Sequence, residues 1–316
     1  MAEFYQDGRV GWVEGPGHLY VVSDLHGNLH DFLRIVEIWE QDEDACLLFL
    51  GDLFHGPYLT EAQWAPYRMS LGDYYYDQSA ALFRCYLKLK ERYPTRVRAL
   101  LGNHEHAHVG GPRVAKFTPD EAYSFEANLQ PSERISLLEE LAQWPWIVGS
   151  RCGVAFTHGA PPPTPFNRSR LDSESLYVED PQRWVVPGTA ILSELLWRRC
   201  SPPQDVEQFL NYLSDITELP QNVVVYGHEP CPGGYEVEHE KLFNLSTSFA
   251  MRRAEKCYLR IPLDHYLGNS LDVESHIISL YAHNSETLVD HDQTIDEEAD
   301  LESTCTDTTD LISKSL

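Results

Sequence analysis

Five short segments of the sequence place acidic, amide or imidazole side chains where an apolar run ends. They read Ser23-Asp24-Leu25-His26-Gly27-Asn28, Gly51-Asp52-Leu53-Phe54-His55-Gly56, Gly102-Asn103-His104-Glu105, His158-Gly159 and Gly227-His228-Glu229. Carboxylate oxygen, amide oxygen and imidazole nitrogen suit Mn²⁺, Fe²⁺ or Zn²⁺, and the lack of a Cys ligand argues against a purely soft-metal site. The set is large enough for two divalent ions that share one carboxylate, so we predict a dinuclear hydrolytic centre. The candidate ligands are Asp24, His26, Asp52, Asn103, His158 and His228.

Strand-like apolar runs precede four of these segments, at residues 19–22, 46–50, 97–101 and 223–226. Because an α/β sheet usually carries its site at the edge where its strands end, we expect the polar tips to converge there. Glycines flank the candidate ligands where the backbone must turn sharply or approach another strand. These glycines are Gly27, Gly51, Gly102 and Gly227.

Helical spacing of apolar residues covers residues 29–39, and Asn28 is predicted to cap this helix rather than to bind metal. A second helix, rich in Leu, Lys and Arg, is predicted at 79–93, just before Pro94. Two helices are expected within 120–143, and others at 191–198 and 205–216. Further strands are predicted at 154–157, 241–245, 257–261 and 276–280.

The order and spacing of the five segments resemble the signature of the calcineurin-like metallophosphoesterases. Over about residues 18 to 250, they are similar to the phosphoprotein phosphatase branch, which is related to bacterial serine/threonine phosphatases and diadenosine tetraphosphatases. The fold expected is of the α/β (α+β) class, a two-sheet β-sandwich with helices on both outer faces.

The resemblance also implies a role for each candidate residue. One metal would take Asp24 and His26, the other would take Asn103, His158 and His228, and Asp52 would bridge them. Activated water would attack phosphorus in line, so no nucleophilic side chain is needed. His104 would protonate the leaving group, which makes His104 and Asp52 the expected catalytic residues.

Phosphate binding also needs cationic donors. Arg199 and Arg198 follow Leu195-Leu196-Trp197, and an arginine after such a tryptophan is similar to a phosphate-binding position in bacterial members of the family. Forked guanidinium geometry suits a phosphoryl group. Arg199 is the first candidate and Arg198 the second, the alternative for each being a surface arginine, and Asn103 is a further expected substrate contact.

The second segment departs from the pattern of the family. Protein phosphatases usually read Gly-Asp-x-x-Asp-Arg-Gly, whereas this chain has His55 and Gly56 in place of the Asp that orients the proton donor and of the adjacent Arg. Leu101 likewise stands where many members carry an arginine. If His55 occupies the place of the missing Asp, it lies near His104, and repulsion keeps at least one of the two imidazoles neutral. His55 is then a candidate phosphate contact, the alternative being a turn residue.

The expected function is metal-dependent hydrolysis of phosphomonoesters, with phosphoserine or phosphothreonine in proteins as the first candidate substrate. A bis(5′-nucleosyl)-tetraphosphatase or another nucleotide phosphohydrolase is the alternative. Gly-Asp-Leu-Phe-His also looks like the second motif of double-strand-break nucleases, but those enzymes and cyclic-nucleotide phosphodiesterases end with Gly-His-x-His, and this chain has Pro230 there. A metal-binding scaffold without activity is the non-enzymatic alternative.

Composition narrows the class of partner and compartment. The net charge of −25 disfavours nucleic acid and leaves phosphorylated protein or a small phosphoester as the expected substrate. Seven cysteines without Cys-x-x-Cys spacing, and an N-terminus without an apolar signal segment, predict reduced thiols in the cytoplasm. No apolar stretch approaches the roughly 20 residues of a membrane span, so no membrane partner is expected.

One catalytic domain is predicted over residues 1–284. Within it, residues 57–78 form an aromatic-rich insert, which we interpret as packed on the core; a lid or a partner surface is the other interpretation. Residues 285–316 contain ten acidic residues and one lysine, so this Ser/Thr-rich tail is predicted to be disordered.

Overall fold

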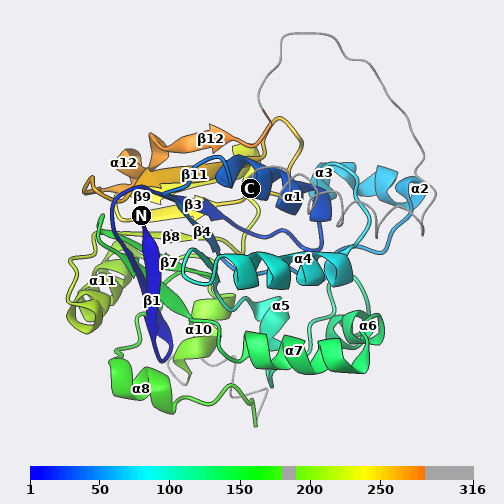
Figure 1. Cartoon of the computed structure of the whole chain (residues 1–316), viewed down its shortest axis with the longest axis horizontal. Helices are drawn as coiled ribbons and strands as arrows, with labels where there is room; N and C mark the ends of the chain where they lie inside the picture. The colour runs from blue at the N-terminus through cyan, green and yellow to red at the C-terminus, as the bar shows by residue number, and fades with distance from the viewer. Residues whose placement is uncertain (180–189, 282–316) are drawn as a thin grey trace. The chain divides into compact units, whose positions relative to one another are not determined.

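Two β-sheets pack face to face in the computed structural model, which describes residues 1–179 and 190–281 (Figure 1). The seven-stranded sheet runs, in spatial order, β1 (Glu3–Asp7), β2 (Val10–Glu14), β6 (Ile147–Ser150), β7 (Val154–Thr157), β8 (Val223–Tyr226), β10 (Leu242–Leu245) and β9 (Tyr235–His239). The five-stranded sheet runs β12 (Ile277–Ser279), β11 (Cys257–Pro262), β3 (His18–Val22), β4 (Cys46–Phe49) and β5 (Val97–Ala99). Parallel pairing joins β3 to β4 to β5 and β7 to β8 to β10, so these strands end at common edges.

Alternate side chains of the central strands enter two different cores. On β4, Cys46 and Leu48 face the interior of the sandwich, whereas Leu47 and Phe49 join the core beneath the helices. The same alternation places Val223 and Val225 of β8 between the sheets and Val224 on the helical side. Because both faces are buried, these strands are continuous apolar runs rather than alternating ones.

Helices cover the outer face of each sheet. On the five-stranded sheet, α1 (Leu29–Trp39) contacts α4 (Ser79–Arg92), and Phe32 stacks on Phe49 with ring centroids 5.5 Å apart. On the seven-stranded sheet, α11 (Pro203–Thr217) packs against β6 and β8. The remaining helical segments of the described residues are α2 (Glu61–Trp64), η1 (Ala65–Tyr67), α3 (Arg68–Leu71), α5 (Asn103–His106), α6 (Glu121–Ala127), α7 (Pro131–Leu141), α8 (Arg168–Ser173), α10 (Ile191–Trp197), η2 (Pro232–Gly234) and α12 (Ser270–Glu274). This arrangement confirms the predicted sandwich with helices on both outer faces (Figure 1).

Most predicted elements agree with the structure to within one or two residues. Asn28 is the predicted N-cap of α1, and its side chain accepts a hydrogen bond from the Asp31 amide at 3.2 Å. The sequence interpretation missed the hairpin of β1 and β2 and the strands β6 and β9. It also missed the short helices α8 and α12.

The insert at 57–78 consists of short helical turns beside the site. Trp64 is buried within it, and the Tyr75 hydroxyl donates a hydrogen bond to the His26 carbonyl oxygen at 3.1 Å. These contacts are what packing on the core predicts. Tyr67 and Met69 are exposed by 58% and 83%, so contact with a partner stays a prediction for this part of the insert.

The six cysteines in the described ranges are all free thiols. No helix of residues 1–179 or 190–281 combines the length and the apolar character needed to cross a membrane. The predicted domain boundary at residue 284 and the acidic tail at 285–316 lie outside the described residues.

Candidate metal centre

The candidate ligands come from both sheets and meet where the strands end. Asp24 and Asp52 follow β3 and β4, Asn103 begins α5 just after β5, and His158 and His228 follow β7 and β8. All six predicted ligands are buried. Four of them have left-handed backbone angles, with φ of 49° at Asp24, 45° at His26, 52° at Asp52 and 73° at His228. Non-glycine residues rarely adopt such angles, and their clustering marks a site whose geometry the fold imposes.

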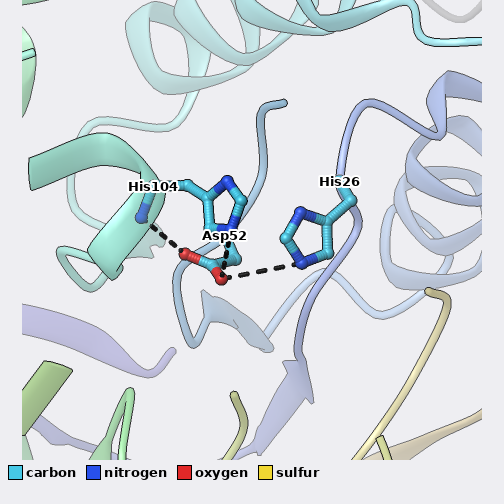
Figure 2. Close-up of side chains that lie close together, drawn as sticks. All are labelled: His26, Asp52 and His104. Carbon is cyan, nitrogen blue, oxygen red and sulfur yellow. Dashed lines mark hydrogen bonds and ion pairs between the residues drawn. The ribbon is translucent and has the colours of Figure 1, made fainter. Parts of the chain in front are cut away.

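Asp52 stands at the middle of this cluster. Its Oδ2 lies 3.6 Å from His26 Nε2, and its Oδ1 lies 3.5 Å from His158 Nε2. Figure 2 shows dashed lines that join the carboxylate to a ring nitrogen of His26 and to one of His104. On the far side, Asn103 Oδ1 lies 2.9 Å from His158 Nε2 and 3.1 Å from His228 Nδ1. Asp52 therefore lies within reach of both His26 and His158, one candidate ligand from each predicted group, and its bridging role stays a prediction.

Backbone carbonyls orient two of the imidazoles. Nδ1 of His158 lies 2.8 Å from the Leu50 carbonyl oxygen, and Nδ1 of His26 lies 3.0 Å from the His55 carbonyl oxygen. Because a carbonyl oxygen only accepts hydrogen bonds, each Nδ1 carries the proton and donates it. Nε2 of each ring then presents its lone pair toward Asp52, as metal-ligating histidines do.

Close approach explains the glycines beside the ligands. A Cβ on Gly51, whose φ is +97°, would lie 2.9 Å from His158 Nδ1. A Cβ on Gly227 would lie 2.5 Å from Asp24 Oδ2, and the next backbone amide, that of His228, donates to both Asp24 carboxylate oxygens at 3.0 and 3.2 Å. Glycine at these positions lets β8 and its ligand approach the segment after β3.

The donor atoms fit divalent cations. His158 carries its proton on Nδ1, so its Nε2 and Asn103 Oδ1 are two acceptors that face one another at 2.9 Å, with His228 Nδ1 beside them. His228 Nε2 has no hydrogen-bond partner among residues 1–179 and 190–281. Burial, together with the charge of Asp52, raises the pKa of Asp24 to about 6. Such unpaired acceptors and buried acids are stabilised by bound cations.

Glu105 holds the Asp52 turn in place and was not predicted. Its Oε2 accepts the amide of Asp52 at 2.8 Å, and its Oε1 accepts those of Leu53 and Phe54 at 2.8 and 3.1 Å. The His104 amide in turn donates to Asp52 Oδ1 at 3.1 Å. The second and third sequence segments are thus locked together by backbone amides and carboxylates.

His104, the expected proton donor, lies between two carboxylates. Its Nε2 is 3.9 Å from Asp52 Oδ2, and its Nδ1 is 2.9 Å from Oε2 of Glu121, the first residue of α6. Burial alone would lower the pKa of His104, but the charges of Asp52 and Glu121 outweigh it and raise the pKa above its ordinary value. The sequence interpretation assigned no role to Glu121.

His55 lies beside His104, as expected if it takes the place of the missing aspartate, with ring centroids 5.4 Å apart. Its Nδ1 is 3.5 Å from Glu121 Oε2, and its Nε2 is 2.8 Å from His108 Nε2. Burial, with the neighbouring imidazoles, lowers the pKa of His55 to about 3, so the ring is neutral at pH 7. Both ring nitrogens face protein groups, and a phosphate contact by His55 stays a prediction.

The two candidate arginines lie in different surroundings. Arg198 is held by Asp205 at 2.9 Å and by the Cys200 carbonyl oxygen at 2.9 Å, so its guanidinium already has structural partners. Arg199 forms an ion pair with Glu229, and its side chain is 63% exposed. Because Glu229 directly follows the candidate ligand His228, this ion pair places Arg199 near the candidate centre.

Lys116 is a second cation near the centre that the sequence interpretation missed. Its Nζ lies 4.0 Å from the ring centroid of Phe249, and that ring is 4.7 Å from the ring of His26. The charge of Lys116 also contributes, after burial, to lowering the pKa of His26. The segment that carries Lys116 has no strand or helix pattern, so only its place in the fold reveals it.

Comparison with known proteins agrees with this geometry. Residues 17–246 match the family described as calcineurin-like phosphoesterase. The chain is 24% identical over 235 residues to a protein phosphatase 2A catalytic subunit of Dictyostelium discoideum, an alignment that covers 68% of this chain and 63% of that protein. It is 35% identical over 86 residues to the serine/threonine-protein phosphatase PP2A-like PPG1 of Saccharomyces cerevisiae, covering 27% of this chain and 18% of that one. The chain therefore spans less than two thirds of the length of either relative.

Two solved structures are also similar. A serine/threonine phosphatase from Saccharomyces cerevisiae, described as similar to human phosphatase PP5, has a TM-score of 0.47 at 15% identity, with 78% of this chain and 72% of that chain covered. A putative diadenosine tetraphosphatase has a TM-score of 0.38 at 18% identity, with 76% and 88% covered. The family match spans all five segments that carry the candidate ligands. The chain belongs to the calcineurin-like phosphoesterase family.

Proposed function

We propose that this protein is a dinuclear metallophosphatase that hydrolyses phosphomonoesters, with phosphoserine and phosphothreonine of proteins as its substrates and Mn²⁺ as its metal. One observation carries the proposal: Asp52 belongs to two groups of side chains that could each hold an ion, one with His26 and His104 and one with His158 and His228. The names of the amoebal and yeast relatives support protein substrates. A mixed carboxylate, amide and imidazole set supports a borderline divalent ion.

The residues of the site divide the work of hydrolysis. Bound divalent ions supply positive charge for the phosphoryl oxygens and acidify the attacking water. Asp52, His26 and His158 would hold the ions, because hydrogen bonds from the His104 amide and to backbone carbonyls fix the orientations of these side chains. His104 keeps Nδ1 against Glu121 and turns Nε2 toward the centre, so Nε2 delivers the proton to the departing oxygen.

The sequence motifs lack two arginines that bind phosphate in related enzymes. Lys116 and Arg199 take over this role as the phosphate-binding cations. Charge-assisted hydrogen bonds are worth about 1.5–3 kcal/mol. We therefore expect Lys116→Ala and Arg199→Ala each to raise KM for p-nitrophenyl phosphate by roughly tenfold or more, with a smaller effect on kcat. The inhibition constant for inorganic phosphate should rise in parallel. Arg113→Ala, which removes an exposed cation paired with Asp120, is the matched control, and an equal effect there would contradict the assignment.

The substrate class is tested by turnover on a panel of phosphoesters. With Mn²⁺ added, phosphopeptides and p-nitrophenyl phosphate should be hydrolysed faster than bis-p-nitrophenyl phosphate, because Pro230 stands where a phosphodiesterase carries its last histidine. Preference for the diester would instead favour a phosphodiesterase, and preference for a bis-nucleoside tetraphosphate would favour a nucleotide hydrolase. If the protein binds two metal ions but hydrolyses none of these compounds, it is a metal-binding scaffold without activity.

A further inference from the structure

Glu121 is a buried carboxylate aimed at the candidate proton donor. It is 2% exposed, and its Oε2 lies 2.9 Å from His104 Nδ1 and 3.5 Å from His55 Nδ1. Neither Glu121 Oε2 nor His104 Nδ1 has a partner of hydrogen-bond geometry among the described residues, so the two atoms interact as an ion pair. Within the described ranges, no Lys or Arg forms an ion pair with Glu121. A buried carboxylate is costly unless it interacts with the groups around it, and the groups that face Oε2 are these two imidazoles.

The fold fixes Glu121 in this position. Asp120 caps α6 by accepting the Tyr123 amide at 3.1 Å, so Glu121 begins the helix. The other carboxylate oxygen of Glu121, Oε1, accepts the Phe117 amide at 2.5 Å, which turns the side chain inward. One turn later, Phe125 packs beside the His55 ring, with centroids 5.8 Å apart, and anchors α6 beneath the site.

We propose that Glu121 is the positioning residue for His104 and replaces, from a distant part of the chain, the carboxylate that the second motif lacks. A carboxylate on Nδ1 fixes the ring and its tautomer, so that Nε2 points at the leaving oxygen. His55 stands where the motif would carry that carboxylate, and its Nδ1 faces Oε2, the same Glu121 oxygen that faces His104. The proposal rests on the proposed function for its chemistry, but the contact itself can be observed without turnover.

Leaving-group dependence separates positioning from simple structural damage. In Glu121→Gln, kcat for phenyl phosphate should fall by about 10- to 100-fold. A general acid contributes a rate enhancement of roughly 10²–10⁴-fold, and positioning of the acid supplies part of it. For 2,4-dinitrophenyl phosphate, whose leaving group needs no proton, kcat should be unchanged, as should KM and metal content. Glu207→Gln, an exposed glutamate paired with Lys241, is the matched control and should equal wild type.

A double variant that moves the carboxylate from position 121 to position 55 tests the proposal a second time. Adding His55→Asp to Glu121→Gln should restore much of the lost rate on phenyl phosphate, because the carboxylate returns to the place it has in the motif. Equal loss on both substrates, or loss of metal from Glu121→Gln, would overturn the proposal, since the first indicates damage and the second indicates that Glu121 is itself a metal ligand. An unchanged rate on phenyl phosphate would overturn it as well.

Nuclear magnetic resonance of ¹⁵N-histidine tests the contact independently of activity. In wild type, the Nδ1 proton of His104 should exchange slowly with water, and this protection should be lost in Glu121→Gln but kept in Glu207→Gln. If the protein hydrolyses no phosphomonoester yet shows this pattern, the proposed function fails while the positioning contact stands. If turnover is normal and the pattern is absent, the positioning role fails alone.

Discussion

Replacing Asp52 with asparagine is expected to abolish turnover and to remove metal from the protein. The carboxylate lies 3.6 Å from His26 Nε2 and 3.5 Å from His158 Nε2, so a single residue serves both ligand groups. Loss of a partner in the outer shell of a metal site costs about 10- to 100-fold in affinity or activity. Loss of the central negative charge should exceed this, and we expect kcat/KM for p-nitrophenyl phosphate to fall by at least roughly 10³-fold.

Metal analysis and steady-state kinetics on the same preparation test this expectation. Asparagine keeps the shape of Asp52 and one acceptor oxygen for the His104 amide, so the fold should persist and circular dichroism should match wild type. Asp7→Asn, which changes an exposed aspartate paired with Arg168, is the matched control. Full activity with two metal ions still bound to Asp52→Asn would refute the bridging assignment.

The predictions that succeeded depended on local sequence. The runs at 46–50 and 223–226 have both faces buried, and such strands are apolar throughout, so they can be recognised without knowledge of the fold. Ligand segments follow these runs directly, which is why their convergence could be expected. Strand β9 was missed because its residues are half-buried or exposed, so its sequence carries no apolar run.

The groups that sequence missed owe their position to tertiary structure. Glu121 lies far along the chain from the Asp52 motif and reaches His104 only because α6 begins beside α5. Lys116 sits in an irregular segment, where no period or motif marks it. The left-handed angles at Asp24 and Asp52 are also imposed by the surrounding fold, since aspartate alone does not require them. Sequence thus indicated the candidate ligands that the fold brings together, but not Glu121 and Lys116, which the fold places beside them.

Replacing His104 with asparagine is expected to lower kcat for phenyl phosphate by about 10²–10⁴-fold, the usual contribution of a positioned general acid. The ring is 3% exposed and lies between Asp52 and Glu121, and no other described imidazole has one nitrogen toward each of these carboxylates. The loss should shrink for 2,4-dinitrophenyl phosphate, and metal content should stay at the wild-type level. An equally large loss on both esters would mean that His104 supports the centre rather than donating the proton.

Combining His104→Asn with Glu121→Gln then shows whether the two residues act as one unit. If Glu121 works only by orienting His104, its substitution costs nothing further once the imidazole is gone, and the two losses in kcat are strongly non-additive. The comparison needs four proteins, one substrate with a poor leaving group, and matched metal loading. Additive losses would show that Glu121 acts on the reaction by a route that does not pass through His104. In that case the carboxylate would act through His55 or Phe117, the other groups that it contacts.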